Sequence, residues 1–455
     1  MHFATINPAN NQLIKRFPQH TWRQVEQILH KSEYGLAINR TSAMLVRTKR
    51  MHTVADILEV NKHHYAALIT LEMGKPMREA IAEIEKCVAT CRYFADNAKH
   101  FLKDEAINTE NSLSMVSHLP IGNILAIMPW NFPFWQVFRF AAPALMAGNA
   151  IVLKHAPNVP QCAMAIEDIF HAAHFPEGIF KNVFVEESKV KWLINDPRIH
   201  ALTFTGSANT GSKVAELAAK NIKKIVLELG GSDAFIVLDD ANVKEAAKVA
   251  VQSRMLNCGQ SCIAAKRFIV AKSVAREFTM LMAEHIRALK TGDPNDPDTD
   301  IGPMARPDLV LNAERQMRES IKMGAQILTG GSRPIVGAGN YFYPTLLIGC
   351  RKGMPVFDEE VFAPIAPIAT VENMNEAITL ANETQYGLGA SIWTTDADKA
   401  MRIARQVHSG VAAINTMVQS DPRLPFGGVK KSGYGRELSE YGIREFTNTK
   451  TIVMK

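Results

Sequence analysis

The first hundred residues place apolar side chains at the period of a helix. Ile81, Ile84, Val88 and Cys91 recur three or four positions apart, and mainly polar or charged residues lie between them. This spacing gathers the apolar side chains on one face of a helix. The pattern predicts a helical region from residue 21 to about residue 102.

Short apolar runs replace this pattern after Asn111. The runs expected to form strands are residues 113–119, 123–128, 150–153, 179–185, 200–204 and 224–229, and helical stretches such as 160–174 and 211–220 lie between them. Strands that alternate with helices indicate parallel βαβ units. They predict a doubly wound sheet whose ligands bind at the carboxyl ends of the strands.

A second alternating series runs from Ala234 to Ile414 and predicts a second α/β domain, with a junction near Gly230. The C-terminal residues predict a short helix followed by a strand over residues 446–453. That strand needs a sheet edge to pair with, and another subunit is one source of such an edge.

Composition places the chain among globular enzymes. Its 455 residues carry 51 Lys and Arg against 45 Asp and Glu, a formal charge of +6, and 47% of them are hydrophobic. These values exclude collagen-like, disordered and small disulfide-stapled proteins. The basic residues are dispersed along the chain, so we expect no nucleic-acid partner.

Cysteine usage and the apolar segments bear on the compartment. Six cysteines are too few for a disulfide framework in a chain of this length, and no Cys-x-x-Cys pair is present, so we expect a reducing compartment and no metal site. The N-terminus has no signal-peptide pattern, and prolines and polar residues interrupt the most apolar stretch, residues 121–153. We therefore expect a cytoplasmic protein with no membrane partner.

Two reactive residues stand in unusual surroundings. Cys262 follows a glycine-bearing turn, where partial exposure and nearby backbone N–H groups lower the pKa of a thiol. An isolated cysteine is otherwise most often a structural residue. Glu228 lies inside an apolar strand, where burial raises a carboxyl pKa towards that of a general base. A glutamate that is simply paired with a lysine is the alternative.

Three further motifs offer binding groups. Asn131 is an amide between two prolines and two aromatic residues, suited either to donate to an oxyanion or to cap a loop. Gly206-Ser207 follows an apolar run and opens a helix, so it either binds a phosphate or only caps that helix. Glu360 beside Phe362 either supports a ribose and a nicotinamide or forms a solvated acidic turn. The Gly-x-Gly-x-x-Gly fingerprint of dinucleotide sites is absent.

Taken together, these motifs resemble those of the aldehyde dehydrogenase superfamily, over the whole chain. The ordered landmarks are Pro-Trp-Asn-Phe-Pro, a strand ending in Lys154, Phe-Thr-Gly-Ser, Glu-Leu-Gly-Gly, Gly-Gln-x-Cys, Glu-Glu-x-Phe-x-Pro, and Pro-Phe-Gly-Gly followed by Lys-x-Ser-Gly-x-Gly-Arg-Glu. Seven landmarks in this order exceed chance. The segments Leu-Lys-His-Ala-Pro-Asn and Glu-Leu-Gly-Gly-Ser-Asp look like those of the short bacterial succinate-semialdehyde dehydrogenases.

The resemblance implies an α/β fold with two doubly wound α/β domains and a small bridging β-sheet that oligomerises. Residues 1–102 and 121–230 would form the dinucleotide-binding domain, and residues 231–425 the catalytic domain. Residues 103–120 and 426–455 would form the oligomerisation and bridging segments. A homodimer or homotetramer is implied as well.

The resemblance also implies the reaction, which is the NAD(P)-dependent oxidation of an aldehyde, here succinate semialdehyde to succinate, through a cysteine thioester. Cys262 would be the nucleophile, the Asn131 amide would stabilise the oxyanion, and Glu228 would activate water. The implied cofactor-binding residues are Trp130, Lys154, Gly206, Ser207, Glu360 and Phe362, and the implied substrate-binding residues are Arg139, Trp135 and Ser420.

Arg139 supports this choice of substrate. It lies in an apolar segment, where an unpaired guanidinium is costly, so it needs an anion. In the enzymes that the chain resembles, the matching arginine faces the substrate, and Ser420 corresponds to a serine that binds the substrate carboxylate. Pairing of Arg139 with a carboxylate of the protein is the alternative.

Departures from the family pattern limit these implications. Pro157 stands where NAD-preferring relatives have a glutamate, so we expect either NAD or NADP, with weak discrimination and a slight preference for NAD. Leu256 stands where many longer succinate-semialdehyde enzymes have an arginine, and Arg254 lies two positions earlier, which weakens a two-arginine carboxylate clamp. Cys258 adds a second thiol near Cys262, and a disulfide between them would need Cα atoms within about 7 Å.

Three other functions are open at this point. A CoA-acylating relative would resolve the thioester with CoA, although the presence of Glu228 favours water. A non-catalytic scaffold on the same fold would be expected to lack Cys262, Glu228 or Asn131, and all three are present. A cysteine hydrolase would need a histidine partner, which no local motif supplies.

Overall fold

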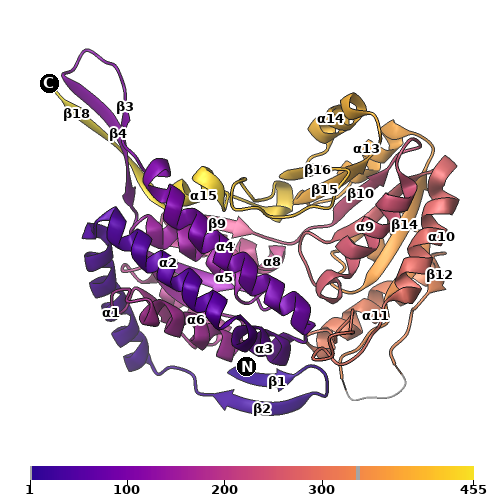
Figure 1. The fold of residues 1–455 in the computed structure, drawn as a ribbon, viewed down its shortest axis with the longest axis horizontal. Helices are drawn as coiled ribbons and strands as arrows, with labels where there is room; N and C mark the ends of the chain where they lie inside the picture. Colours follow the sequence, from indigo (N-terminus) through magenta and orange to yellow (C-terminus); the bar gives the residue numbers. More distant parts are fainter. Residues whose placement is uncertain (1–2, 335–338) are drawn as a thin grey trace.

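The computed structural model describes residues 3–334 and 339–455. A hairpin opens the chain, and the helical region predicted over residues 21–102 follows as four helices (Figure 1). These elements are β1 (Phe3–Asn7), β2 (Gln12–Phe17), α1 (Trp22–Thr41), α2 (Met44–Val60), α3 (Lys62–Met73) and α4 (Met77–Phe101). The sequence analysis did not predict the hairpin.

Local sequence signals explain these helices. Thr21 begins α1, because its side chain accepts a hydrogen bond from the backbone N–H of Gln24. The buried face of α4 contains Ile84, Val88 and Cys91, as their spacing predicts. Helices α2 and α3 pack against α4, so this face belongs to the core of the first α/β unit.

A six-stranded sheet forms the centre of this unit. Its strands lie in the order β17-β9-β8-β5-β6-β7 and are parallel except for β17. The strands are β5 (Asn123–Met128), β6 (Ala150–His155), β7 (Phe180–Asn182), β8 (Ala201–Thr205), β9 (Lys224–Glu228) and β17 (Gly433–Tyr434), and the helices are α5 (Trp135–Met146), α6 (Pro160–Ala172), α7 (Glu187–Asn195) and α8 (Ala208–Lys220). Strands β5 and β8 are neighbours although β6 and β7 lie between them in sequence. The strand order reverses there, and ligands bind at the carboxyl ends of strands at such a point.

A seven-stranded sheet forms the centre of the second unit. Its order is β12-β13-β14-β11-β10-β15-β16, and only β12 runs antiparallel to its neighbour. The strands are β10 (Asp233–Val237), β11 (Ala265–Ala271), β12 (Gln326–Thr329), β13 (Thr345–Ile348), β14 (Ile365–Val371), β15 (Gly389–Trp393) and β16 (Val411–Ile414). The helices are α9 (Val243–Met255), the 3-10 helix η1 (Leu256–Gly259), α10 (Lys272–Ala288), α11 (Pro307–Lys322), α12 (Pro355–Asp358), α13 (Met374–Asn382) and α14 (Ala397–Gln406).

A three-stranded antiparallel sheet projects from the body of the molecule (Figure 1). It consists of β3 (Glu105–Ala106), β4 (Leu113–Pro120) and β18 (Thr447–Met454), in the order β18-β4-β3. Strand β18 pairs with β4 over its whole length, so the edge that the predicted terminal strand needs lies in the same chain.

The C-terminal segment serves both this sheet and the six-stranded one. After the 3-10 helix η2 (Lys430–Ser432), strand β17 joins the six-stranded sheet opposite Leu227 and Glu228, and α15 (Ser439–Glu445) then leads to β18. The predicted assignment of residues 426–455 to a bridging segment does not account for β17. The predicted junction near Gly230 coincides with the passage from β9 in one large sheet to β10 in the other.

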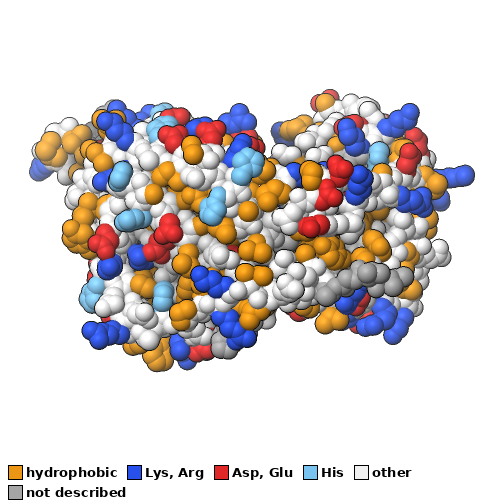
Figure 2. All heavy atoms as spheres, turned by 60° about the horizontal axis from the view of Figure 1, so that its bottom comes forward, with side chains coloured by type: hydrophobic (Ala, Val, Ile, Leu, Met, Phe, Trp, Pro, Cys, Tyr) orange, Lys and Arg blue, Asp and Glu red, His pale blue; other side chains and the backbone are white. Residues whose placement is uncertain are grey.

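Charges are mixed on the molecular surface. Figure 2 shows basic and acidic side chains interspersed over one face, so that neighbouring charges compensate one another there. Within residues 3–334 and 339–455, no helix combines the length and the apolar character that a membrane span requires.

A buried ion pair joins the helical region to the first sheet. Lys75 and Glu83 form it, and both side chains are excluded from solvent. The other Glu83 oxygen accepts hydrogen bonds from the backbone N–H groups of Phe134 (2.9 Å) and Trp135 (3.0 Å), where α5 begins. A carboxylate at this position satisfies free N–H groups and complements the helix dipole. The pair thereby fixes the start of α5 relative to α4.

We predict that Lys75→Met lowers the free energy of unfolding by about 3–5 kcal/mol, because it leaves the buried Glu83 charge without its partner. Urea unfolding followed by circular dichroism measures this change. Lys62→Met is the matched control, because Lys62 pairs with Glu85 at the surface, and such pairs contribute about 0–1 kcal/mol. Equal losses in the two variants would contradict the structural role of the buried pair.

Candidate active site

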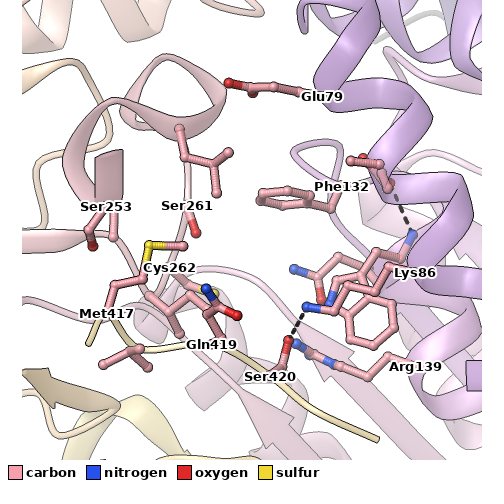
Figure 3. A pocket seen from close by; sticks show the side chains of 18 of the residues that line it. Glu79, Lys86, Phe132, Arg139, Ser253, Ser261, Cys262, Met417, Gln419 and Ser420 are labelled. Carbon is pink, nitrogen blue, oxygen red and sulfur yellow. Dashed lines mark hydrogen bonds between the residues drawn. The ribbon is translucent and has the colours of Figure 1, made fainter. Parts of the chain in front are cut away.

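A cavity of about 420 Å³ brings together four of the residues singled out in the sequence. Figure 3 shows it between α4 and α5 on one side and the segments that carry Cys262 and Ser420 on the other. Cys262, Trp135, Arg139 and Ser420 all line it. We call it the substrate cavity. Asn131 and Glu228 are buried and are not among its lining residues.

A left-handed turn aims the thiol at this cavity. In η1 the backbone of Asn257 and Cys258 has φ of 54° at both residues, and the chain leaves the direction of α9 there. Gly259 follows with φ of 72°, and a Cβ at this glycine would lie 2.3 Å from the carbonyl oxygen of Ala363. The close approach explains why the turn contains a glycine.

Contacts with Glu79, the Asn131 backbone and Arg254 at the end of α9 hold this turn. The Asn257 N–H donates to the Glu79 carboxylate at 2.8 Å, and the Asn257 amide donates to the Asn131 carbonyl at 2.7 Å. Arg254 is fully buried and donates to the Gly259 carbonyl at 2.8 Å. The other hydrogen bonds of Arg254 also go to backbone carbonyls, so it supports the turn and faces no substrate.

Cys262 is the one partly exposed cysteine among the residues that the structure describes, and all six cysteines are free. Burial of its surroundings raises the pKa of the Cys262 thiol to about 11, although the charges of Arg139 and Lys266 act in the opposite direction. The pKa depression expected from the sequence is therefore wrong, because desolvation outweighs the nearby positive charges. The thiol is protonated at neutral pH in this arrangement and needs a proton acceptor to react.

Asn131 packs against the nucleophile segment. It is 3% exposed, and its amide nitrogen donates to the Gln260 carbonyl at 3.1 Å. Capping of a neighbouring loop, one of the two roles considered from the sequence, is therefore present. A side-chain amide has two N–H bonds, so a second one remains beside the one given to Gln260.

Glu228 ends β9 as a buried carboxyl group. Its Oε1 atom has no hydrogen-bond partner within residues 3–334 and 339–455, and no lysine of these residues lies within ion-pair distance. Burial raises its pKa well above the ordinary value, and the Arg139 charge lowers it by a smaller amount. The predicted direction of the shift is confirmed, and the raised pKa makes the Glu228 carboxylate a stronger base than an exposed one.

Arg139 has a partner that the sequence analysis did not identify. Its Nε forms a buried ion pair with the carboxylate of Glu437, and its guanidinium lies 4.8 Å from the centre of the Phe426 ring. The protein therefore supplies an anion for Arg139, which was the alternative considered from the sequence. The Nη2 atom of Arg139 has no hydrogen-bond partner among the described residues, and a contact of Arg139 with the substrate stays a prediction. Its charge still acts on both Cys262 and Glu228, so Arg139 lies near both groups.

Lys86 is a cavity residue that the sequence analysis missed. Its Nζ donates to the Ser420 hydroxyl at 2.7 Å and lies 4.3 Å from the centre of the Trp135 ring. Glu79, Glu83 and Lys86 follow one another at spacings of four and three, which puts three charged side chains on one face of α4. This spacing is the signal in the sequence that could have identified these three residues, because charged side chains are rarely buried.

A second cavity, of about 960 Å³, lies at the carboxyl ends of β5, β6 and β8. It is lined by four of the predicted cofactor-binding residues, which are Trp130, Lys154, Gly206 and Ser207. Ser207 caps α8, since its hydroxyl accepts from the Thr210 N–H at 3.3 Å. We call it the cofactor cavity. Its location at the reversal of strand order is the expected one for a dinucleotide.

Unsatisfied polar groups in this wall fit such a ligand. Both polar atoms of the Asn158 amide are buried and have no partner among the described residues. Lys154 is 6% exposed, and burial lowers the pKa of its amine. Buried polar groups of this kind need hydrogen-bond partners, and the hydroxyl and phosphate groups of a nucleotide supply them.

Glu360 and Phe362 are not among the residues that line the cofactor cavity. One Glu360 oxygen accepts from the Gly231 N–H at 3.0 Å and lies 3.9 Å from Lys266 Nζ. Phe362 packs edge-on against Trp130, with 5.9 Å between the ring centres. Within the described residues, no group of three or more His, Cys, Asp or Glu side chains could hold a metal ion.

Comparisons with known proteins agree with this arrangement. The sequence profile of the aldehyde dehydrogenase family matches residues 1–452. A protein of Synechocystis sp. named probable succinate-semialdehyde dehydrogenase (NADP+) is 49% identical over 452 residues, 99% of each chain. A succinate-semialdehyde dehydrogenase (NADP+) of Mycobacterium tuberculosis is 44% identical and again covers 99% of each chain.

The fold has close counterparts among solved structures. The succinic semialdehyde dehydrogenase of Streptococcus pyogenes, solved in complex with NADP+, superposes with a TM-score of 0.97 at 36% identity and covers 99% of each chain. This similarity confirms the predicted fold class of doubly wound α/β units with a small antiparallel sheet. The chain therefore belongs to the aldehyde dehydrogenase family.

Proposed function

We propose that this protein oxidises succinate semialdehyde to succinate with NADP+. The observation that carries the proposal is that Cys262, the partly exposed cysteine, opens onto a cavity that also contains Lys86 and Ser420. A thiol can attack an aldehyde, and cationic and hydroxyl groups suit a second, carboxylate end of the same molecule. The names of the relatives from Synechocystis and M. tuberculosis support the same substrate.

Cys262 acts as the nucleophile. The thiol first loses its proton to solvent; the thiolate sulfur then bonds to the aldehyde carbon, and the carbonyl oxygen becomes an oxyanion. The second N–H of the Asn131 amide and the backbone N–H of Cys262 stabilise that charge. The chemistry that NADP+ supplies when bound is acceptance of a hydride from the adduct, which leaves a thioester on Cys262.

Glu228 acts in the second half of the reaction. Its carboxylate takes a proton from a water molecule as the water oxygen bonds to the thioester carbon. The carbon–sulfur bond breaks, the carboxylic acid leaves, and Cys262 is free as a thiolate. Burial raises the pKa of Glu228, so the group readily accepts a proton. This role favours water over CoA as the acceptor of the acyl group.

The cofactor cavity suits NADP+. Lys154 and Asn158 would hold the adenosine ribose and its phosphate, Ser207 the pyrophosphate and Glu360 the nicotinamide ribose. Pro157 places no carboxylate where a 2′-phosphate would be repelled. The slight preference for NAD expected from the sequence gives way to NADP+, which the names of the relatives specify.

We extend the proposal to the compartment and the assembly. The six free cysteines are those of a protein in a reducing compartment, and we assign the protein to the cytoplasm. The projecting sheet exposes Leu113, Val453 and Met454, apolar side chains of the kind that subunit contacts bury. We propose that this sheet forms a homodimer or homotetramer.

The proposed activity predicts a specific pattern of turnover. With NADP+, the kcat/KM for succinate semialdehyde should exceed that for butanal, which lacks the distal carboxylate, and NADP+ should be preferred over NAD+. Absorbance of the reduced cofactor measures all four combinations. Preference for NAD+ would contradict the cofactor assignment, and absence of turnover with both aldehydes would contradict the activity.

We predict that Cys262→Ala abolishes aldehyde oxidation and leaves NADP+ binding intact, because the thiol forms the covalent bond and lies outside the cofactor cavity. Steady-state rates and fluorescence titration of the cofactor measure the two effects. Cys258→Ala removes a buried thiol of the same segment and should retain turnover. An inactive Cys258→Ala variant together with an active Cys262→Ala variant would show that Cys258, not Cys262, is the nucleophile.

We predict that Glu228→Gln gives one burst of reduced cofactor followed by very slow turnover, because the thioester forms but is not hydrolysed. Stopped-flow absorbance resolves the two phases. The amide keeps the size of the side chain, so the fold should be unaffected. Loss of the burst itself would place Glu228 in an earlier proton transfer.

A further inference from the structure

Lys86 differs from the other cations of the substrate cavity. Among the described residues that line it, Arg78 forms an ion pair with Asp300 and Arg139 forms one with Glu437. No carboxylate of these residues lies within ion-pair distance of Lys86. The cavity therefore contains one positive charge that the protein itself does not pair.

The carboxylates of the cavity wall are already engaged. Glu79 accepts the backbone N–H of Asn257, and Glu83 forms its buried ion pair with Lys75. Neither is within ion-pair distance of Lys86, although all three side chains arise from one face of α4. Because these two carboxylates are engaged elsewhere, the Lys86 charge is available to an anion that enters the cavity.

The surroundings of Lys86 make an anion favourable there. Its amine lies against the Trp135 ring at 4.3 Å, and Phe132, Ile263 and Val418 add apolar surface to the same cavity. A cation held in such surroundings without a counter-ion is costly. Burial and the charge of Arg139 lower the pKa of Lys86 to about 8, so the amine is still mainly charged at neutral pH.

The hydrogen-bond donors of Lys86 and Ser420 match the two oxygens of one carboxylate. Lys86 gives one of its three N–H bonds to the Ser420 hydroxyl at 2.7 Å, and two are left. Because Ser420 accepts that bond, its own O–H is free to donate. Figure 3 shows Lys86 reaching from α4 to Ser420, beside Arg139 and in the cavity that Cys262 lines. Three donors thus face the two oxygens of a carboxylate.

We propose that Lys86 and Ser420 bind the distal carboxylate of the aldehyde substrate, and that Lys86 is the cation that selects ω-carboxylated aldehydes. The proposal rests on the proposed function, since it names the group that recognises the substrate of Cys262. It also separates the roles of two cations. Arg139, paired with Glu437, influences Cys262 and Glu228 electrostatically, and Lys86 contacts the substrate.

Lys86→Met is the test, because methionine keeps the apolar stem over Trp135 and removes only the charge. The kcat/KM for succinate semialdehyde should fall roughly 10- to 100-fold, mainly through KM, since a hydrogen bond to a charged group is lost. The kcat/KM for butanal should change less than about twofold. Lys86→Arg should restore part of the preference because it restores the charge.

Lys99→Met is the matched control, because Lys99 is an exposed lysine on the same helix and lies outside the cavity. It changes the net charge equally and should leave the ratio of the two kcat/KM values unchanged. An unchanged ratio in Lys86→Met would overturn the proposal and point to Arg78 or Arg139, the other cations of the cavity. An equal loss on both aldehydes would also overturn it, since it would show a structural role.

The pH dependence supplies a second readout. Charged and titratable groups that act on Lys86 are Arg139 on α5, Glu83 and Cys87 on α4, and Asp421 next to Ser420. The protonated amine binds the carboxylate, so the KM for succinate semialdehyde should rise as the pH increases through about 8. The KM for butanal should show no such rise, and Lys86→Met should lose the difference between the two aldehydes.

Binding of succinate separates this inference from the proposed function. Calorimetry on the intact protein should show succinate binding that weakens at least roughly tenfold in Lys86→Met and is unchanged in Lys99→Met. Wild-type protein that binds succinate through Lys86 but does not oxidise succinate semialdehyde would contradict the proposed function alone. Equal affinities in wild type and Lys86→Met, or no binding to wild type, would overturn the assignment of Lys86.

Discussion

The left-handed backbone of Asn257 and Cys258 is the constraint on which the site depends, because it turns the chain out of α9 and aims Cys262 at the substrate cavity. A residue other than glycine adopts such a conformation at a cost of about 1–3 kcal/mol, so the surroundings must hold it. Here Glu79 and the Asn131 carbonyl bond to Asn257 from positions 178 and 126 residues away in the sequence. The Cys262 thiol is thus placed by the packing of separate segments, and the same contact holds Asn131 against the turn.

Helix α4 contacts several of these segments and fixes their positions relative to one another. Glu79 bonds to the nucleophile turn, Glu83 to the first N–H groups of α5, and Lys86 to Ser420. Each contact leaves the same face of one helix, at successive turns. A rotation or shift of α4 would therefore move the turn before Cys262, the start of α5 and the Ser420 hydroxyl together. This coupling explains why charged side chains occupy positions where a helix usually buries apolar ones.

Local patterns were enough to predict most of the fold, because the helical region and the apolar strands can be recognised from the order of neighbouring residues. The N-terminal hairpin was missed, since β2 exposes five of its six residues and carries no alternating pattern. For the candidate site too, local patterns predicted some features and missed others. Motifs identified Cys262 and Glu228, but the partner of Arg139 is Glu437, 298 positions away, and no short-range pattern links them. The direction of the Cys262 pKa shift was predicted wrongly for a related reason. Desolvation of the thiol depends on all the residues that surround it, and a short motif does not contain them.

The last part of the chain returns to the first sheet, and this has a consequence for how the protein is made. Strand β17 lies beside Glu228, and Glu437 neutralises Arg139 close to the thiol. Synthesis proceeds from the N-terminus, and earlier units fold first. A nascent chain that already contains β5 to β16 still lacks β17 and Glu437, so Glu228 and Arg139 are without these neighbours until residues 433–437 have been synthesised and have folded back. The surroundings of Cys262 and Glu228 are thus completed late in synthesis, after most of both large sheets has been made.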